Sequence, residues 1–385
     1  MMRRHITLTV TAILLLFAAA CNRQGGSFTI EGVLTNHEFD HATVYLYANE
    51  SKTAMDSAVV VDGKFQFKGR VERQMMGTLA STVEKANMKC TCVLVLEPGK
   101  IYINMETDSV SGTPLNDKYY HTYIADDTSK ALLNQIDYTI ESYYAAVSEE
   151  DAKDKADSIM KQYDLLSDSY MEHIKRVVNK SYRENGDNIL GAHALHQLVK
   201  IDSLSYDSLN TILSQSVPIV AEYEPLHEDL TRLFHLDNTA EGKPYVDFEG
   251  IDFATGKATK LSKMIDTNYI TIIDFWASWC SPCRQEIADN LVRLYAEYHD
   301  KGLNIIGVDV WDKSADHRAM VEKMGIEYPQ LVDTVGVATD TYSISGVPTI
   351  MIIDKQGTIV KRNVRGEAIE AAVVELLAPA EKSNK

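Results

Sequence analysis

The stretch at residues 269–286, YITIIDFWASWCSPCRQE, constrains the fold of this 385-residue chain more than any other. Its first seven residues are mostly β-branched, aromatic or aliphatic, which predicts a strand buried on both faces. After the cysteines, apolar residues recur at the spacing of one face of an amphipathic helix: Ile287, Leu291, Leu294, Tyr295 and Tyr298. Cys280 and Cys283 therefore lie where a buried strand passes into a helix.

Such a Cys-x-x-Cys pair can bind zinc, staple the chain or act as a redox couple. Zinc requires about four ligands, and no second Cys or Cys–His pair follows at finger spacing. A purely structural disulfide across two intervening residues would hardly reduce the entropy of the unfolded chain, because the loop it closes is so short. A helix N-terminus supplies unpaired N–H groups and partial positive charge, which lower the pKa of a thiol. The position favours a redox pair in which Cys280 attacks and Cys283, one turn further on, resolves the mixed disulfide.

The N-terminus, MMRRHITLTVTAILLLFAAAC, has the pattern of an export signal over residues 1–20. Its apolar run is shorter than the roughly 20 residues of a membrane span. The small residues before Cys21 resemble the lipobox of bacterial lipoproteins, although those usually carry Leu where Ala18 stands. That resemblance implies cleavage before Cys21, lipidation of its sulfur and membrane anchoring through the lipid. We expect residues 21–27 to be a lipidated tether and the protein to face the periplasm, where disulfides persist.

Length and charge limit the remaining possibilities. A chain of 385 residues exceeds the usual single core, so we expect more than one domain. The formal net charge of −17 argues against binding the phosphate backbone of nucleic acids. Besides Cys21 and the redox pair, the sequence contains Cys90 and Cys92 on a likely strand. We expect them to point to opposite faces and not to form a mutual disulfide.

The pattern of predicted secondary structure changes twice along the chain. Residues 28–113 contain short alternating strands and a hairpin signal at Asp62-Gly63, which predict an antiparallel β-sandwich or barrel. Residues 114–238 have the pattern of helices. Residues 239–385 alternate strand and helix in the order β-α-β-α-β-β-α, which predicts an α/β sandwich with an antiparallel hairpin at one end. The fold class is therefore multi-domain, with an antiparallel β domain, a helical middle segment and a C-terminal α/β domain.

The stretches IIDFWASWCSPCRQE and GVPTIMIIDKQGTIV resemble the thioredoxin superfamily, and more closely its envelope branch of TlpA- and ResA-like thiol-disulfide oxidoreductases. The resemblance covers roughly residues 242–380 and includes GIEYPQLVD, which is similar to the extra central segment of that branch. It implies that Cys280 and Cys283 are the redox disulfide and that Pro348 is a cis-proline facing them. The backbone of Val347 would then pair with an extended substrate, and Trp279 would cap the site as a flat apolar surface.

Asp274 stands where thioredoxin keeps a buried acid. Such a carboxylate accepts the proton of the resolving thiol, and burial raises its pKa towards neutrality. The structural alternative is an aspartate at the strand end in solvent. Some members of the envelope branch carry other residues at this position.

These features together predict an enzyme that reduces disulfides of protein substrates in the cell envelope, without metal or organic cofactor. An upstream membrane thiol reductant would reduce the Cys280–Cys283 disulfide again. The resemblance also implies a role in cytochrome c maturation. One alternative is a peroxiredoxin-like peroxidase, although Ala277 stands where those enzymes carry a threonine. The other is a binding lipoprotein in which the first 240 residues act and the thioredoxin-like domain assists.

Overall fold

The computed structural model of the protein describes residues 25–48, 51, 53–83, 88–148 and 153–378. The predicted signal peptide and Cys21 lie outside these residues. The chain divides into two compact units. The first comprises residues up to Asp202 together with Gln215–Pro225, and the second comprises Ser203–Ser214 and everything from Leu226 onward. The helical residues 114–238 therefore contribute to both units.

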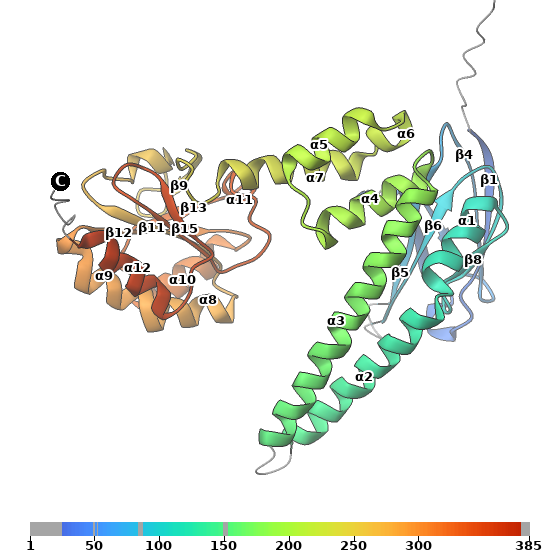
Figure 1. Ribbon diagram of the computed structural model, residues 1–385, viewed down its shortest axis with the longest axis horizontal. Helices are drawn as coiled ribbons and strands as arrows, with labels where there is room; N and C mark the ends of the chain where they lie inside the picture. Colours follow the sequence, from blue (N-terminus) through green and yellow to red (C-terminus); the bar gives the residue numbers. More distant parts are fainter. Residues whose placement is uncertain (1–24, 49–50, 52, 84–87, 149–152, 379–385) are drawn as a thin grey trace, which may run out of the picture. The chain divides into compact units, whose positions relative to one another are not determined.

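The first unit contains two four-stranded sheets, of order β4-β1-β7-β8 and β3-β2-β5-β6 (Figure 1). Their strands are β1 (Gly26–Val33), β2 (Thr43–Ala48), β3 (Asp56–Val59), β4 (Lys64–Val71), β5 (Met75–Val83), β6 (Met88–Leu96), β7 (Gly99–Asn104) and β8 (Ser109–Ser111). Alternate residues are buried, as on the inner faces of a sandwich. The prediction of a wholly antiparallel domain is wrong at one pair, because β1 and β7 run parallel. Between them the chain passes through the second sheet and returns in the same direction, a crossover that parallel neighbours require.

Strand β6 carries both remaining described cysteines as free thiols. The expectation that Cys90 and Cys92 point to opposite faces is wrong, because side chains two residues apart on a strand share a face. Cys92 is buried, and burial raises its pKa to about 12. Cys90 is half-buried, and its Sγ lies 3.0 Å from the carbonyl oxygen of Met105. Cys92 therefore serves as a small apolar filler.

The helices of the first unit follow its sheets. They are α1 (Pro114–Tyr119), α2 (Asp127–Val147), α3 (Lys153–Glu184), α4 (Ile189–Ile201) and α6 (Pro218–Ala221). Helices α2 and α3 pack side by side (Figure 1). Asp126 caps α2 by accepting from the backbone N–H of Ser129 at 3.0 Å, and it also contacts His173 of α3 at 2.5 Å. None of the helices in the described part of the chain is both long enough and apolar enough to cross a membrane.

The second unit is built on a seven-stranded sheet of order β10-β9-β13-β12-β11-β14-β15. Its strands are β9 (Glu249–Asp252), β10 (Ala258–Lys260), β11 (Ile270–Trp276), β12 (Leu303–Asp309), β13 (Gln330–Val332), β14 (Thr349–Ile353) and β15 (Ile359–Arg362). Strands β11, β12 and β13 are parallel, and the other neighbouring pairs are antiparallel. Every residue of β11 and β12 is buried, as expected of central strands covered on both faces.

Helices cover both faces of this sheet. The helices of the second unit are α5 (Tyr206–Gln215), α7 (Glu224–Asn238), α8 (Ser281–Glu286), α9 (Val292–Tyr298), α10 (Ser314–Met324), α11 (Val337–Thr341) and α12 (Glu367–Leu377). A π-helical turn at Ile287–Leu291 joins α8 to α9. The first core cluster packs residues of these joined helices, α10 and α12 against one face of the sheet. The second core cluster packs α11 and Leu261 against the other.

The α/β character of residues 239–385 and the closing hairpin β14–β15 agree with the predicted layout. The predicted strand order omits β9, β10 and β13, and α11 is also additional. These strands are only three or four residues long, so they offer too few alternations for a periodicity to show. Strand β13 lies within the segment 325–333 and extends the sheet beyond β12.

Candidate active site

Strand β11 places the cysteine pair at one edge of the sheet. It lies between β12 and β14 and ends at Trp276, four residues before Cys280. Its even-numbered residues Ile270, Ile272 and Trp276 pack in the same core cluster as Cys283. Its odd-numbered residues Ile273 and Phe275 pack on the opposite face. The sequence therefore fixes both where the strand ends and which of its side chains share a face with the cysteines.

Cys280 and Cys283 form a disulfide whose Cα atoms are 5.2 Å apart. Cys280 is the N-cap of α8, and its Sγ accepts a hydrogen bond from the backbone N–H of Cys283 at 3.1 Å. Cys280 retains 4% exposure, whereas Cys283 is fully enclosed. An N–H donor aimed at the Cys280 sulfur stabilises a thiolate there when the disulfide is reduced. Both residues are buried, and Cys280 is the one that keeps some exposed surface.

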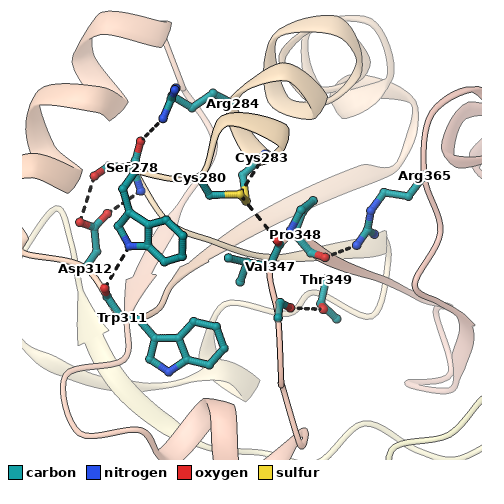
Figure 2. The surroundings of a disulfide bond; sticks show 12 residues. Ser278, Cys280, Cys283, Arg284, Trp311, Asp312, Val347, Pro348, Thr349 and Arg365 are labelled. Carbon is teal, nitrogen blue, oxygen red and sulfur yellow. Dashed lines mark hydrogen bonds between the residues drawn. A yellow bond between two sulfur atoms is a disulfide. The ribbon is translucent and has the colours of Figure 1, made fainter. Parts of the chain in front are cut away.

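The segment before β14 faces this pair. The Val347–Pro348 peptide bond is cis, and the Val347 carbonyl oxygen lies 3.7 Å from Cys280 Sγ (Figure 2). The Thr349 hydroxyl donates to the Gly346 carbonyl at 2.8 Å, and the Arg365 guanidinium donates to the carbonyl of Pro348. These contacts hold the backbone of residues 346–348 beside the sulfur.

The loop that precedes Cys280 is tied down by neighbouring residues. Asp312 accepts from the Ser278 backbone N–H at 2.5 Å and from the Ser278 hydroxyl at 2.9 Å. Arg284 donates to the Ser278 carbonyl at 2.6 Å (Figure 2). The indole N–H of Trp279 donates to the carbonyl of Trp311 at 3.1 Å, and Trp279 is 59% exposed. Sequence reasoning did not select Asp312, Trp311 or Arg284. Parallel strands end at the same edge of a sheet, so residues that follow β12 are expected near those that follow β11. This rule would have indicated Trp311 and Asp312.

Asp274 lies in the middle of β11, on the face that carries Ile272 and Trp276 and therefore the face of Cys283. It is 1% exposed, so the solvent-exposed alternative is wrong. Among the described residues, its Oδ2 has no hydrogen-bond partner. Burial raises the pKa of Asp274 to about 8, while the positive charge of Arg365 lowers it and the carboxylate of Glu286 raises it. The carboxyl group can therefore exchange a proton near neutral pH.

On the β12 side of Asp274, two residues of neighbouring strands lie in line with it. Gly307 pairs with Asp274, and Gln330 pairs with Gly307. A Cβ on Gly307 would lie 2.2 Å from Gln330 Oε1, so only glycine leaves room for this carboxamide beside Asp274. Gln330 accepts from the Trp276 indole at 3.0 Å and donates to the Tyr328 carbonyl at 3.2 Å. Burial and the Asp274 charge raise the pKa of the Tyr328 hydroxyl well above its ordinary value. Asp274 therefore shares an otherwise apolar core with the polar groups of Gln330 and Tyr328.

Three residues close to the site have metal-ligand chemistry. Atoms of Asp309, Asp312 and His317 lie within 4.8 Å of one another. The oxygens of Asp312 already accept from Ser278 and from the Lys313 N–H at 2.8 Å. His317 Nδ1 lies 3.2 Å from Asp309 Oδ1, and both side chains are buried. Asp312 therefore holds the loop at Ser278, and Asp309 and His317 form a buried pair. The three residues are fewer than the four ligands of a structural zinc site.

A buried parallel strand, a disulfide at the following helix N-terminus and a cis X-Pro peptide opposite it together define a thioredoxin-like domain. Residues 242–362 match the AhpC/TSA family. Residues 28–119 match a domain of unknown function, DUF4369.

The curated relatives each match only part of the chain. Thiol-disulfide oxidoreductase ResA of Bacillus subtilis is 26% identical over 150 residues, which cover 38% of this chain and 81% of the relative. Its namesake in Bacillus thuringiensis subsp. konkukian is 30% identical over 105 residues, which cover 27% of this chain and 60% of the relative. The chain thus spans about three fifths of the length of the first curated relatives it matches.

Solved structures also match part of the chain. The thioredoxin domain of a thiol-disulfide oxidoreductase from Bacteroides vulgatus is 27% identical and covers 36% of this chain and 99% of its own, with a TM-score of 0.33. A thiol:disulfide interchange protein from Bacteroides sp. is 27% identical and covers 38% and 96%, with a TM-score of 0.34. The C-terminal region is accordingly a thioredoxin-like AhpC/TSA domain whose curated relatives are oxidoreductases.

Proposed function

We propose that this protein is a thiol-disulfide oxidoreductase that reduces protein disulfides through Cys280 and Cys283. The supporting observation is the environment of Cys280. Its sulfur receives an N–H hydrogen bond at a helix N-terminus and lies beside a cis X-Pro segment, and Cys280 is the less enclosed residue of the pair. These are the requirements of an attacking thiolate with a place for an extended substrate next to it.

The chemistry proceeds in two exchanges. The Cys280 thiolate attacks one sulfur of a substrate disulfide, forms a mixed disulfide and releases the other substrate sulfur as a thiolate. Cys283 then loses its proton and attacks Cys280 Sγ, which releases the second substrate thiolate and forms the Cys280–Cys283 disulfide. The substrate gains two electrons and the protein pair loses them. A dithiol donor must return two electrons before the next cycle, and no metal or organic cofactor takes part.

Asp274 is the proposed proton acceptor for Cys283. Both side chains face the same layer, and the pKa of about 8 allows Asp274 to take a proton at neutral pH and release it later. Substrate would lie along Val347 and Pro348, whose backbone Arg365 holds in place, with Trp279 as an apolar surface beside the attacking sulfur.

We place this activity in the cell envelope, with the protein anchored by lipid at Cys21 and facing the periplasm. The support is the sequence pattern of residues 1–21, and an oxidising compartment is where protein disulfides form and require correction. The partners are then protein thiols and disulfides, together with an upstream membrane thiol reductant. The reductive direction and a role in cytochrome c biogenesis rest on the resemblance to the TlpA- and ResA-like branch.

A trapping experiment in cells tests the proposal. Cys283→Ala removes the resolving thiol and leaves Cys280 at its helix N-terminus, so mixed disulfides with substrates should accumulate. They should run as larger bands in gels and collapse to one band when reductant is added. Cys280→Ala should trap far less, because Cys283 is fully enclosed. Cys90→Ala, in the other unit, is the matched control and should trap nothing beyond the wild-type level.

The purified full chain distinguishes the alternatives. The proposed enzyme reduces a model protein disulfide such as insulin, and activity requires both Cys280 and Cys283. Consumption of peroxide without any protein thiol acceptor would instead indicate a peroxidase. If Cys283→Ala traps no protein while the wild type still reduces insulin, the binding-lipoprotein alternative gains support.

A further inference from the structure

The hairpin of α2 and α3 exposes a row of large apolar side chains that the proposed chemistry does not use. Both helices extend away from the sheets of the first unit (Figure 1). The exposed apolar residues on one side of this hairpin, called here the hairpin face, are Leu133, Ile140, Tyr144, Val147, Met160 and Met171. Their exposed fractions range from 36% to 68%. A continuous row of this kind is typical of an interaction surface, whereas exposed apolar residues that are scattered singly are not.

On α2, the hairpin face lies next to the stripe that packs against α3. The buried residues of α2 are Ser129, Ile136, Thr139 and Ala146. Their spacings of three and seven residues are those of a helix that faces one partner helix. Ile140 and Val147 each follow one of these buried residues by one position, and Leu133 lies seven residues before Ile140. The three therefore form a second apolar stripe beside the buried one.

On α3, two methionines lie on the same side of the hairpin. His173 contacts Asp126, the N-cap of α2, so the stripe of α3 that contains His173 faces α2. Ile159 lies two heptads earlier on that stripe, and Met160 directly follows it. Met171 lies eleven residues after Met160, which is about three helical turns. Because the two helices run in opposite directions, positions one residue beyond the contact stripe of each helix lie on the same side of the pair.

Helix α4 already covers the base of this side of α3. Val178 of α3 packs with Ala194 and Leu198 of α4. Ile174 packs against the same cluster and lies three residues after Met171, so α4 lies on the side that carries Met171. This side of the hairpin therefore packs against a helix where α4 reaches it, and its outer part presents exposed apolar residues instead.

The spacing and the area of the hairpin face fit a second copy of the same chain. Leu133, Ile140 and Val147 are seven residues apart, so a two-fold axis at Ile140 brings Leu133 of each copy against Val147 of the other. A large side chain presents about 150 Å² when it is fully exposed, so the face exposes roughly 400 Å² per copy. That area is close to the apolar part of the roughly 800 Å² that each partner buries in a standard interface.

We propose that the hairpin face is a homodimer interface, in which two copies pack their α2–α3 hairpins antiparallel to form a four-helix bundle. A membrane surface fits the face less well. Helices that lie on membranes are rich in lysine and arginine, whereas α2 carries three acidic residues and one lysine. The dimer goes beyond the proposed function and does not depend on the redox chemistry.

Sedimentation of the purified full-length protein tests the interface. The wild type should be a dimer at about 10 µM. Tyr144→Ser should raise the dimer Kd about thirtyfold, the loss typical of one aromatic side chain at the centre of an interface. Tyr138→Ser is the matched control and should leave the Kd unchanged. Tyr138 is 72% exposed on the same helix, but it lies two residues before Ile140 and so points away from the hairpin face. Circular dichroism should show the same helix content for both variants and the wild type.

Cysteine variants test the two-fold arrangement, with a short bismaleimide as cross-linker and the Cys280–Cys283 pair kept as a disulfide. Ile140→Cys lies at the proposed axis and should cross-link to its own copy, whereas Tyr138→Cys should stay at the wild-type level. A mixture of Leu133→Cys and Val147→Cys proteins should cross-link to each other. Either of these alone should cross-link little, because fourteen residues separate the two positions, about 21 Å along a helix.

The other outcomes overturn the dimer and leave the proposed function untouched. A wild type that stays monomeric at about 100 µM has no such interface. If that monomer binds vesicles of anionic lipid and Tyr144→Ser weakens this binding, the hairpin face contacts a membrane instead. Equal weakening of the dimer by Tyr144→Ser and Tyr138→Ser would place the interface elsewhere. Cross-linking of Leu133→Cys to its own copy would show parallel hairpins and contradict the two-fold axis at Ile140.

Discussion

Replacing Asp274 by asparagine should change how the stability of the second unit depends on pH. Burial raises the pKa of Asp274 from 3.8 to about 8, so between these values the folded state holds a proton that the unfolded chain has released. The wild-type free energy of unfolding should therefore fall as pH rises through this window and level off above it. The asparagine variant lacks this group and should not show that part of the decrease.

The magnitude follows from the two pKa values. They are about four pH units apart, and each unit corresponds to about 1.4 kcal/mol. From pH 4 to pH 8, the unfolding free energy of the wild type should therefore fall relative to that of the variant by at most about 6 kcal/mol. Relaxation of the protein around the charge reduces the expected difference to a few kcal/mol. Any effect of the buried asparagine amide that does not depend on pH shifts the unfolding free energy of the variant equally at every pH and does not change its slope against pH.

Urea unfolding followed by tryptophan fluorescence measures this difference. All three tryptophans, Trp276, Trp279 and Trp311, lie in the second unit, so the signal reports that unit alone. The protein is kept oxidised, which removes the cysteines from the titration. Asp289→Asn, at an exposed carboxylate of the same unit, is the matched control. A difference between wild type and Asp274→Asn that stays constant from pH 5 to 9 would refute a raised pKa at Asp274.

Three further predictions concern single side chains. In reduced protein at neutral pH, Cys280 should react with iodoacetamide faster than Cys283, as mapped by mass spectrometry, and preferential labelling of Cys283 would reverse their roles. Cys92, whose pKa is raised to about 12, should remain unlabelled at pH 8 until urea unfolds the first unit; rapid labelling of the native protein would contradict its burial. Asp312→Ala removes two hydrogen bonds to Ser278 and should lower the unfolding free energy of the second unit by about 1–3 kcal/mol. An unchanged urea midpoint for Asp312→Ala would show that these bonds add no net stability.

The elements that the sequence predicts well are those with a strong local signal. Asp62 and Gly63 both adopt positive φ, as the two central residues of a tight turn of this type must. The predicted hairpin itself is limited to the bridge between Val61 and Lys64, because β3 and β4 belong to different sheets. The helices at residues 314–324 and 367–377 begin and end where their periodicity does. Strand β13 and the parallel pairing of β1 with β7 were not predictable in this way, because strand order depends on which distant segments meet.

The same division holds for the candidate site. The sequence alone places Cys280 and Cys283 after a buried strand and at the start of a helix, because both signals lie within about 20 neighbouring residues. Pro348 is indicated only through the resemblance of GVPTIMIIDKQGTIV to the thioredoxin superfamily. The sequence does not indicate that Arg365 contacts the Pro348 carbonyl or that Trp311 accepts from Trp279, since these residues are 17 and 32 positions apart.

Local pattern therefore determined the redox pair, its order along the chain and the type of element on each side of it. Only the tertiary structure decided that Asp274 is enclosed with a raised pKa, that Gln330 occupies the space above Gly307 and that the Trp311 carbonyl accepts from the indole of Trp279. The physical reason is that burial and electrostatic environment are produced by all the segments packed around a residue. Parallel strands bring the loops after β11 and β12 to one edge of the sheet, whatever their separation in the sequence.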